Sequence, residues 1–121
     1  MTAADARRAA ERAGRRAEQL AALHLRLCGF TILARRFKCP AGEIDIVARR
    51  GRLLVLAEVK ARADADAALI AVTAKARRRI EAAGRAFLSR HPRLADCGLR
   101  YDIIAVSGLS VRRFADAWRE R

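Results

Sequence analysis

The sequence predicts an α/β fold in which helices cover a single mixed sheet, and two observations lead to this prediction. Apolar residues recur at helical spacing over residues 3–28 and again over residues 63–91. The segments "FTILARRF", "EIDIVAR", "LLVLAEVK" and "LRYDIIAV" are instead short and rich in β-branched residues, with turn-forming residues between them. The resulting order, α-β-β-β-α-β, is typical of one mixed sheet with helices on its faces.

The first element is a long amphipathic helix over residues 3–28, which we expect Gly29 to end. Three strands follow, near residues 30–37, 43–49 and 53–60, and the pair Arg50-Gly51 is predicted to form the turn between the last two. The second helix has Asp64 or Asp66 as its cap and ends before Pro92.

A fourth strand is predicted in "LRYDIIAVSG", and "VRRFADAWRER" is predicted to be a short C-terminal helix over residues 111–120. The chain of 121 residues has the length of one domain and contains neither an internal repeat nor a linker. We therefore expect a single domain over residues 1–121.

The charge of the chain is unusual for a globular protein. Lys and Arg total 26 against 13 Asp and Glu, which gives a formal net charge of +13. Most of the cations are Arg, whose planar guanidinium matches phosphate oxygens, so nucleic acid is the leading class of partner. The alternative is that the cations are spread over a solvated surface without a specific partner.

The cysteines and the apolar runs bear on where the protein works. Cys28, Cys39 and Cys97 are far apart and form neither a zinc motif nor a disulfide framework, which favours free thiols in a reducing cytosol. No apolar run reaches the length of about 20 residues that a membrane span needs. The sequence predicts a cytoplasmic protein with no membrane partner.

Carboxylates are concentrated in the stretch "GEIDIVARRGRLLVLAEVKAR". Side chains alternate along a strand, so Glu43 and Asp45 share one face of their strand, as Glu58 and Lys60 do of theirs. A turn of even length puts Glu43 opposite Glu58 with Asp45 diagonal to it, whereas an odd turn splits the set.

In the even register, the carboxylates repel one another unless a cation or a proton offsets their charge. Carboxylate and carbonyl oxygens are hard ligands that suit Mg²⁺ or Mn²⁺. One hypothesis is therefore a divalent-metal site that polarises a phosphodiester. The alternative is that these acids pair with some of the many arginines.

The spacing of Asp45, twelve residues and then Glu58-Val59-Lys60 resembles the PD-(D/E)-x-K signature of restriction-endonuclease-like nucleases, a group that includes archaeal Holliday-junction resolvases. More narrowly, the stretch from "AEQLAALHLRLCGF" to "GEIDIVARRGRLLVLAEVKAR" resembles the bacterial YraN-like family of uncharacterised small proteins. The resemblance covers about residues 14–107 and implies a restriction-endonuclease-like fold.

The resemblance also implies roles for individual residues. Asp45, Glu58 and the Val59 carbonyl would hold the metal, and Lys60 would orient or activate the attacking water. Glu18 matches the glutamate of the family's first helix, and Glu43 belongs to the family motif. Both are included in the candidate catalytic set.

Arg62 and Lys75 also match family positions and could meet phosphate. Lys75 stands in a basic run with Arg77, Arg78 and Arg79, which is either a phosphate-contacting surface or a solvated helix face. The chain departs from the family pattern at Arg36, where the family favours Asn, and at Ala17, where it usually has Gly. Asp102 lies either near the site or in a pair with Arg100, and we leave it out of the catalytic set.

The function predicted from these features is nucleic-acid binding with Mg²⁺- or Mn²⁺-dependent hydrolysis of phosphodiester bonds. DNA is favoured over RNA as the substrate, and a homodimer remains open. Two alternatives stand beside the nuclease: a non-catalytic nucleic-acid-binding module on a nuclease fold, and a basic adaptor whose partner is another protein.

Overall fold

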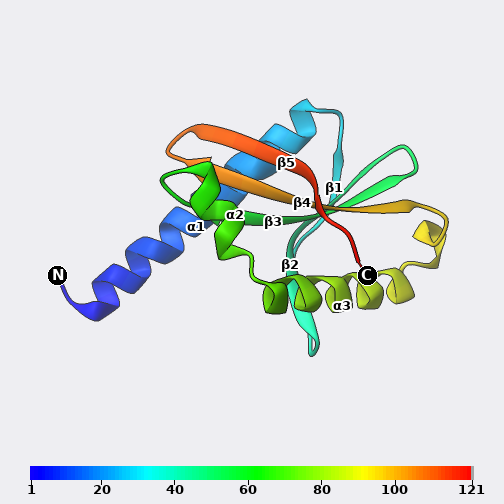
Figure 1. Cartoon of the computed structure of the whole chain (residues 1–121), viewed down its shortest axis with the longest axis horizontal. Coiled ribbons are helices and arrows are strands. Elements are labelled where there is room, and N and C mark those ends of the chain that lie inside the picture. The colour runs from blue at the N-terminus through cyan, green and yellow to red at the C-terminus, as the bar shows by residue number, and fades with distance from the viewer. Residues whose placement is uncertain (121) are drawn as a thin grey trace.

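Five strands form one mixed sheet in the order β1-β2-β3-β4-β5, in which β3 and β4 are parallel and the other neighbours are antiparallel. The structure is a computed structural model that describes residues 1–120 (Figure 1). In chain order the elements are α1 (Ala3–Leu27), β1 (Thr31–Cys39), β2 (Gly42–Arg50), β3 (Leu53–Ala61), α2 (Ala65–Ala71), α3 (Ala74–Arg90), the 3₁₀ turn η1 (Pro92–Leu94), β4 (Gly98–Ser107) and β5 (Ser110–Trp118). The prediction of an α/β protein with helices and one mixed sheet is confirmed.

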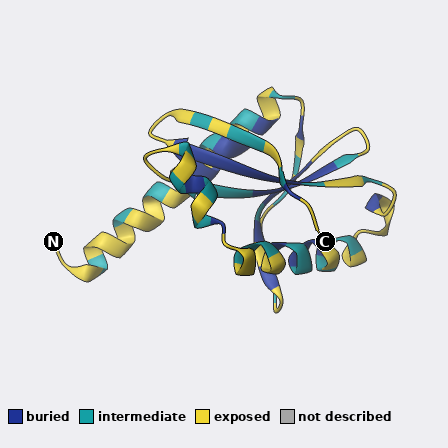
Figure 2. Ribbon diagram, in the orientation of Figure 1, coloured by how far each residue is buried: buried dark blue, intermediate teal, exposed yellow. Residues whose placement is uncertain are grey.

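Helices cover both faces of the sheet, because the central strands alternate apolar side chains between two cores. Val55 and Ala57 of β3 face α1 and pack with its residues Ala21 and Leu25. Their neighbours in β3, such as Leu56, belong to the second core, which α3 closes. Figure 1 shows α1 and α3 on opposite sides of the sheet, and Figure 2 shows that the buried residues lie mainly along the central strands.

The first helix and the first four strands lie where the sequence predicts them. The helix α1 is continuous through Gly14, and the strands differ from the predicted ranges by one or two residues at their ends. Asp64, one of the two predicted caps, accepts a hydrogen bond from the Ala67 N–H at the start of α2.

The predicted C-terminal helix is wrong, because residues 110–118 form the edge strand β5. A tight turn at Gly108 and Leu109 joins it to β4, and Gly108 has a φ of 58°, which suits a hairpin turn. Without β5, the buried strand β4 would expose an unpaired edge. Trp118 stacks on Tyr101 of β4 with ring centroids 5.0 Å apart, so this pairing also buries the large aromatic residue.

The second predicted helix is also corrected, since two helices occupy its range. Val72 and Thr73 interrupt it, and the Thr73 hydroxyl accepts a hydrogen bond from the Ala76 N–H to cap α3. Val72 is buried in the core on the α3 side of the sheet. Burying this β-branched residue and capping a new helix outweigh continuing the first one.

The turn between β2 and β3 lies one residue later than predicted. Arg50 pairs with Leu53, so Gly51 and Arg52 form the two-residue loop, and Gly51 has a φ of 59°. The loop length is still even, which is the condition for Asp45 and Glu58 to share one face of the sheet. However, the register moves Asp45, rather than Glu43, level with Glu58.

Candidate functional site

The candidate site begins where the β2–β3 ladder ends. The paired residues run as far as Ile46 and Ala57. Beyond them, the Asp45 carboxylate replaces a backbone carbonyl and accepts the Val59 N–H, with Oδ2 2.8 Å from the nitrogen. This bond turns the Asp45 side chain toward the next strand, where it meets the Glu58 carboxyl.

The Asp45–Glu58 pair is half-buried, and a negative charge on both carboxyls at the same time is unfavourable. Burial, together with the hydrogen bond to Asp45 and the charge of Asp45, raises the pKa of Glu58 to about 9. The charge of Lys60 acts in the opposite direction, and that of Glu43 adds to the rise. The charges of Asp45, Glu43 and Lys60 therefore all act on the Glu58 carboxyl.

A hollow of about 330 Å³ opens beside this pair, between α1 and the ends of β1 and β2. Its lining combines four acids with three cations and two other residues: Glu11, Glu18, Glu43, Asp45, Arg15, Arg36, Lys38, Gly14 and Val59. Glu18 and Asp45, which the sequence places 27 positions apart, thus come together at one hollow.

Glu18 is fully paired in this hollow. Its side chain is buried, and its two oxygens accept hydrogen bonds from Arg35 Nε at 3.0 Å and Arg36 Nε at 2.9 Å. These contacts raise the pKa of Arg36. Glu18 therefore binds two arginines, of which Arg36 also interacts with the charge of Asp45, and neither of the Glu18 oxygens is free of a cation.

Sequence reasoning missed the Arg35–Arg36 clamp. Neighbouring residues of a regular strand point to opposite faces, so the two arginines are not expected to reach one carboxylate. Arg36 has a φ of 54°, in the left-handed region, and this backbone turn breaks the alternation. Asn, which the YraN-like resemblance leads us to expect at this position, tolerates this region better than Arg.

The predicted phosphate-contacting residues are mostly exposed, but they do not behave alike. Arg62, Lys75, Arg78 and Arg79 are exposed. Arg77 is half-buried, because its Nε donates to the Val72 carbonyl and its guanidinium lies 5.2 Å from the Trp118 ring. Arg77 therefore supports the packing of α3 and is less available to a ligand than its neighbours are.

Gly42 lets α3 approach the start of β2. A Cβ at this position would lie 2.2 Å from the Arg79 carbonyl oxygen, which is too close for any side chain. Close packing against α3 therefore explains why a glycine precedes Glu43. This contact fixes α3 against the strand that carries Glu43 and Asp45.

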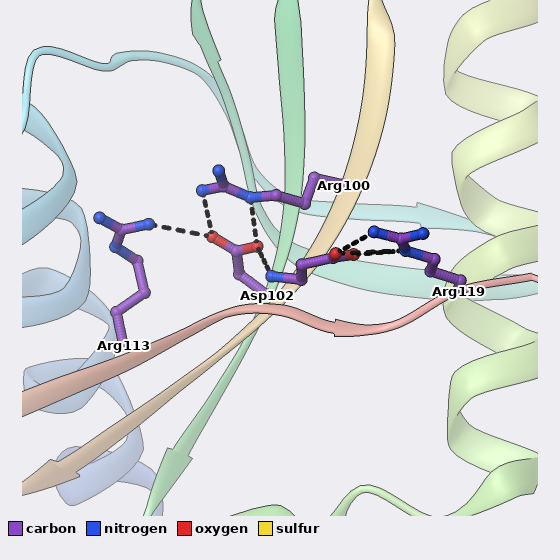
Figure 3. Close-up of polar contacts among 5 residues, drawn as sticks. Arg100, Asp102, Arg113 and Arg119 are labelled. Atoms are coloured by element: carbon purple, nitrogen blue, oxygen red, sulfur yellow. Dashed lines mark hydrogen bonds and ion pairs between the residues drawn. The ribbon is translucent and has the colours of Figure 1, made fainter.

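Asp102 belongs to a separate buried network. It has no exposed surface and accepts two hydrogen bonds from Arg100, at 2.8 and 2.9 Å, and one from Arg113 at 3.4 Å (Figure 3). The Asp116 N–H also donates to it, where the pairing of β4 and β5 is irregular. Of the two alternatives for Asp102, pairing with Arg100 is confirmed.

The donors at the acidic pair fit a hard divalent cation. Two carboxyls and the neighbouring Val59 carbonyl are oxygen ligands, and the raised pKa of Glu58 indicates that the pair takes up a positive charge readily. Within residues 1–120, no group of three or more His, Cys, Asp and Glu side chains is arranged to hold a metal ion. A cation here would therefore take its remaining ligands from the backbone and from water.

The fold and the site define an α/β protein with a half-buried acidic pair at the end of a β-hairpin. The chain belongs to the uncharacterised protein family UPF0102, whose model matches residues 17–106. This membership confirms the YraN-like resemblance.

Similar proteins carry the same family description. A UPF0102 protein of Parvibaculum lavamentivorans is 51% identical over 112 residues, which cover 92% of this chain and 84% of that protein. A UPF0102 protein of Paramagnetospirillum magneticum is 50% identical over 119 residues, covering 94% and 92%. One of Brucella canis is 53% identical over 93 residues, covering 77% and 74%.

None of the helices in residues 1–120 has both the length and the apolar character to cross a membrane.

Proposed function

We propose that this protein binds nucleic acid and hydrolyses phosphodiester bonds in a reaction that depends on Mg²⁺ or Mn²⁺, on a restriction-endonuclease-like fold. The observation that supports this most is the meeting of the Asp45 and Glu58 carboxyls beside the Val59 backbone, in a chain with a net charge of +13. A basic protein keeps two acids in contact at a cost in free energy, so a function at that point is the simplest reason for them.

The roles follow from the chemistry of each group. Asp45, Glu58 and the Val59 carbonyl would hold the cation, which supplies positive charge to the phosphodiester and to the attacking water. Lys60, whose charge acts on Glu58, would orient that water or neutralise charge in the transition state. Hydrolysis adds the hydroxyl of water to phosphorus and a proton to the leaving oxygen.

Glu18 has a supporting role in this proposal. Because Arg35 and Arg36 occupy its two oxygens, it holds these cations at the hollow rather than ligating the metal itself. Arg36, which lines the hollow, would then meet a phosphate that approaches Asp45.

A non-catalytic binding module is the second candidate. It is favoured by the small number of acids, since the described residues bring only Asp45 and Glu58 into contact and Glu18 is already neutralised. In that case, Asp45 and Glu58 have only a structural role, and the cationic surface of the protein binds nucleic acid without cleaving it.

The two candidates differ in turnover. We expect wild-type protein to cleave DNA or RNA with Mg²⁺ or Mn²⁺ and not with EDTA, on a panel of duplex, junction, flap and single-stranded substrates. Asp45→Asn, Glu58→Gln and Lys60→Ala should each abolish cleavage, whereas Asp96→Asn, which changes an exposed acid, should not.

Binding gives the complementary result. Without metal, Asp45→Asn should hold nucleic acid as tightly as wild type or tighter, because it removes a negative charge from the site. Binding without cleavage on every substrate would favour the binding module. Cleavage that persists in Asp45→Asn would locate the activity elsewhere, and failure to bind nucleic acid would favour the protein adaptor.

A further inference from the structure

We propose that residues 3–16 of α1 form a basic arm that holds the phosphate backbone of a duplex entering the candidate site. This inference rests on the proposed function and names the surface that receives the nucleic acid. The arm is the part of α1 that lies before its first buried residue, Ala17. Figure 1 shows it extending beyond the other elements, and Figure 2 shows that its surface is mostly exposed.

The arm has a well-defined start although none of its residues is buried. Thr2 caps the helix by accepting the Asp5 N–H, and the Asp5 carboxylate accepts the Thr2 N–H in return. This capping box satisfies amides at the helix end, so the end of the helix is not itself an anion site. What the arm presents to a partner is its side chains.

Five arginines lie on the arm, against two acids: Arg7, Arg8, Arg12, Arg15 and Arg16. All five are exposed. Within residues 1–120, only Arg8 among them makes an ion pair, at 2.6 Å from Asp5, and both of those side chains are well exposed. Four cations on a short helix are therefore not neutralised by the protein itself.

Four of these arginines share one flank of the helix. Arg8, Arg12 and Arg16 are spaced by four residues and form a row, and Arg15 lies beside it. Together they span about 100° of the helix circumference. Arg15 also lines the hollow that contains Asp45, so this flank of the helix adjoins the candidate site at Arg15.

The length of the arm suits a duplex. Fourteen helical residues extend about 21 Å. A double helix carries about one phosphate charge per 1.7 Å of its axis, so roughly a dozen phosphates pass along the arm. The row of guanidiniums can therefore meet several of them at once.

The arm lacks the residues that other partners of a basic helix require. Its apolar residues are all Ala, so it has no Leu, Phe or Trp to bury in a lipid interface or in the groove of a protein. Bulky apolar residues begin only at Leu20, where the helix is already on the sheet. The arm can therefore recognise a partner only through its charged side chains, which favours a polyanion with regularly spaced phosphates.

The test compares two triple variants with the same change in net charge. Arg8→Gln, Arg12→Gln and Arg16→Gln are combined in one protein. Arg26→Gln, Arg52→Gln and Arg93→Gln, which are exposed positions outside the arm, are combined in the control. Binding of a fluorescein-labelled 20-base-pair DNA duplex is measured by anisotropy in EDTA over a range of KCl concentrations. Thermal melting checks that both variants are folded.

We expect the arm variant to lose about tenfold or more in affinity near 0.1 M salt and its log-log salt slope to fall by up to about 2.7, since each phosphate contact contributes about 0.9. The control should change by less than about threefold, because it removes only long-range attraction. Equal losses in the two variants would overturn the arm. Binding of wild type to vesicles containing phosphatidylserine, and not to the duplex, would overturn it in favour of lipid.

The proposal of the arm and the proposal of nuclease activity can be refuted independently of each other. If wild type binds the duplex through the arm but never cleaves, the arm stands and the nuclease does not. If wild type cleaves with metal and the arm variant binds and cleaves like the control, the nuclease stands and the arm is wrong.

Discussion

Glu18 and Glu58 are both largely buried acids, and their surroundings give them opposite properties. Two guanidiniums hold Glu18 at 3.0 and 2.9 Å, so it is a paired anion. Glu58 faces Asp45, and burial together with that contact raises its pKa to about 9. The positive charge of Lys60 offsets this only in part. A buried carboxylate therefore marks a candidate cation site when the protein leaves it without a cation of its own.

The first prediction concerns the stability of the Asp45–Glu58 pair. In the folded protein Glu58 keeps its proton up to about pH 9, whereas the unfolded chain loses it near 4.5. Unfolding thus releases a proton between these values, and the free energy of unfolding should fall as pH rises through this window. Glu58→Gln removes the titrating group, so its melting temperature should exceed that of wild type at about pH 8.

The measurement is thermal melting in EDTA at pH values between about 5 and 9. Asp96→Asn is the control, because it changes an exposed acid outside the site. If the stabilities of wild type and Glu58→Gln depend on pH in the same way, then the pKa of Glu58 is not raised in the folded protein.

The second prediction concerns Asp102. Asp102→Asn leaves Arg100 and Arg113 without their buried counter-charge, and the Arg113 Nε atom is already buried without a hydrogen-bond partner. We expect a loss of about 3–5 kcal/mol in the free energy of unfolding, measured by urea denaturation. Asp116→Asn should change it little, since that side chain pairs with Arg119 at the surface and the mutation keeps the backbone N–H to Asp102. A loss no larger than that of the control would refute this role.

At the scale of elements, one β-hairpin carries most of the candidate site and α3 locates that hairpin. Glu43, Asp45, Glu58 and Lys60 all come from β2 and β3, which a two-residue loop joins. The contact of Gly42 with the Arg79 carbonyl fixes the start of this hairpin against α3. Packing on one side of the sheet therefore helps to set the position of the acids.

The third prediction uses two glycines with opposite surroundings. Gly42→Ala would place its Cβ against a backbone oxygen, so α3 or β2 must shift, and we expect a loss of about 1–3 kcal/mol in stability. Gly14→Ala meets nothing within 4 Å in the middle of α1 and should gain about 0.5–1 kcal/mol. Urea denaturation measures both. A neutral Gly42→Ala would mean that α3 is not fixed at this point.

The elements that sequence reasoning predicted well are those whose own residues decide the structure. The strands β2 and β3 have apolar side chains on both faces, and Thr2 with Asp5 marks the start of α1. The strand β5 was mistaken for a helix because Ala115, Ala117 and Glu120 favour helices locally. Pairing with the buried strand β4 overrides that preference, and no local signal reports it.

The candidate site divides in the same way. Alternation along the strands predicts that the acids share one face only if the turn has an even length, and the two-residue loop meets this condition. The same reasoning places Glu43, rather than Asp45, opposite Glu58. The pairing of Glu18 with Arg35 and Arg36 could not, because it depends on a left-handed residue within a strand and on the docking of α1. Contacts between distant segments are set by packing rather than by spacing.

At the scale of the whole molecule, two groups of exposed cations lie on separate surfaces. The arm of α1 and the exposed cations of α3 are on elements that cover opposite faces of the sheet. The acidic pair lies between them at the end of the hairpin. A polyanion that reaches Asp45 could therefore be held from the α1 side while α3 adds attraction at longer range.

The fourth prediction tests the α3 surface. Reversal of Lys75, Arg78 and Arg79 to Glu should lower the affinity for duplex DNA and flatten its dependence on salt, because fewer counterions are released on binding. Arg77 is left in place, since it supports the packing over Trp118. The control reverses Arg26, Arg52 and Arg93. Affinity that does not respond to salt would instead favour a protein partner.

The lack of buried residues in the arm has a consequence for its local stability. A helix of about 14 residues is marginal in water by itself, so the backbone of residues 3–16 should open without the rest of the protein, whereas residues from Ala17 onward open only when α1 leaves the sheet. Amide hydrogen exchange should accordingly be fast in the arm and slow between Ala17 and Leu27, and a bound duplex should slow the arm alone. Equal protection along α1 in the free protein would contradict this. If exchange is instead fast in the arm and slow from Ala17 onward, the order of residues 3–16 is maintained by the bound duplex as much as by the fold.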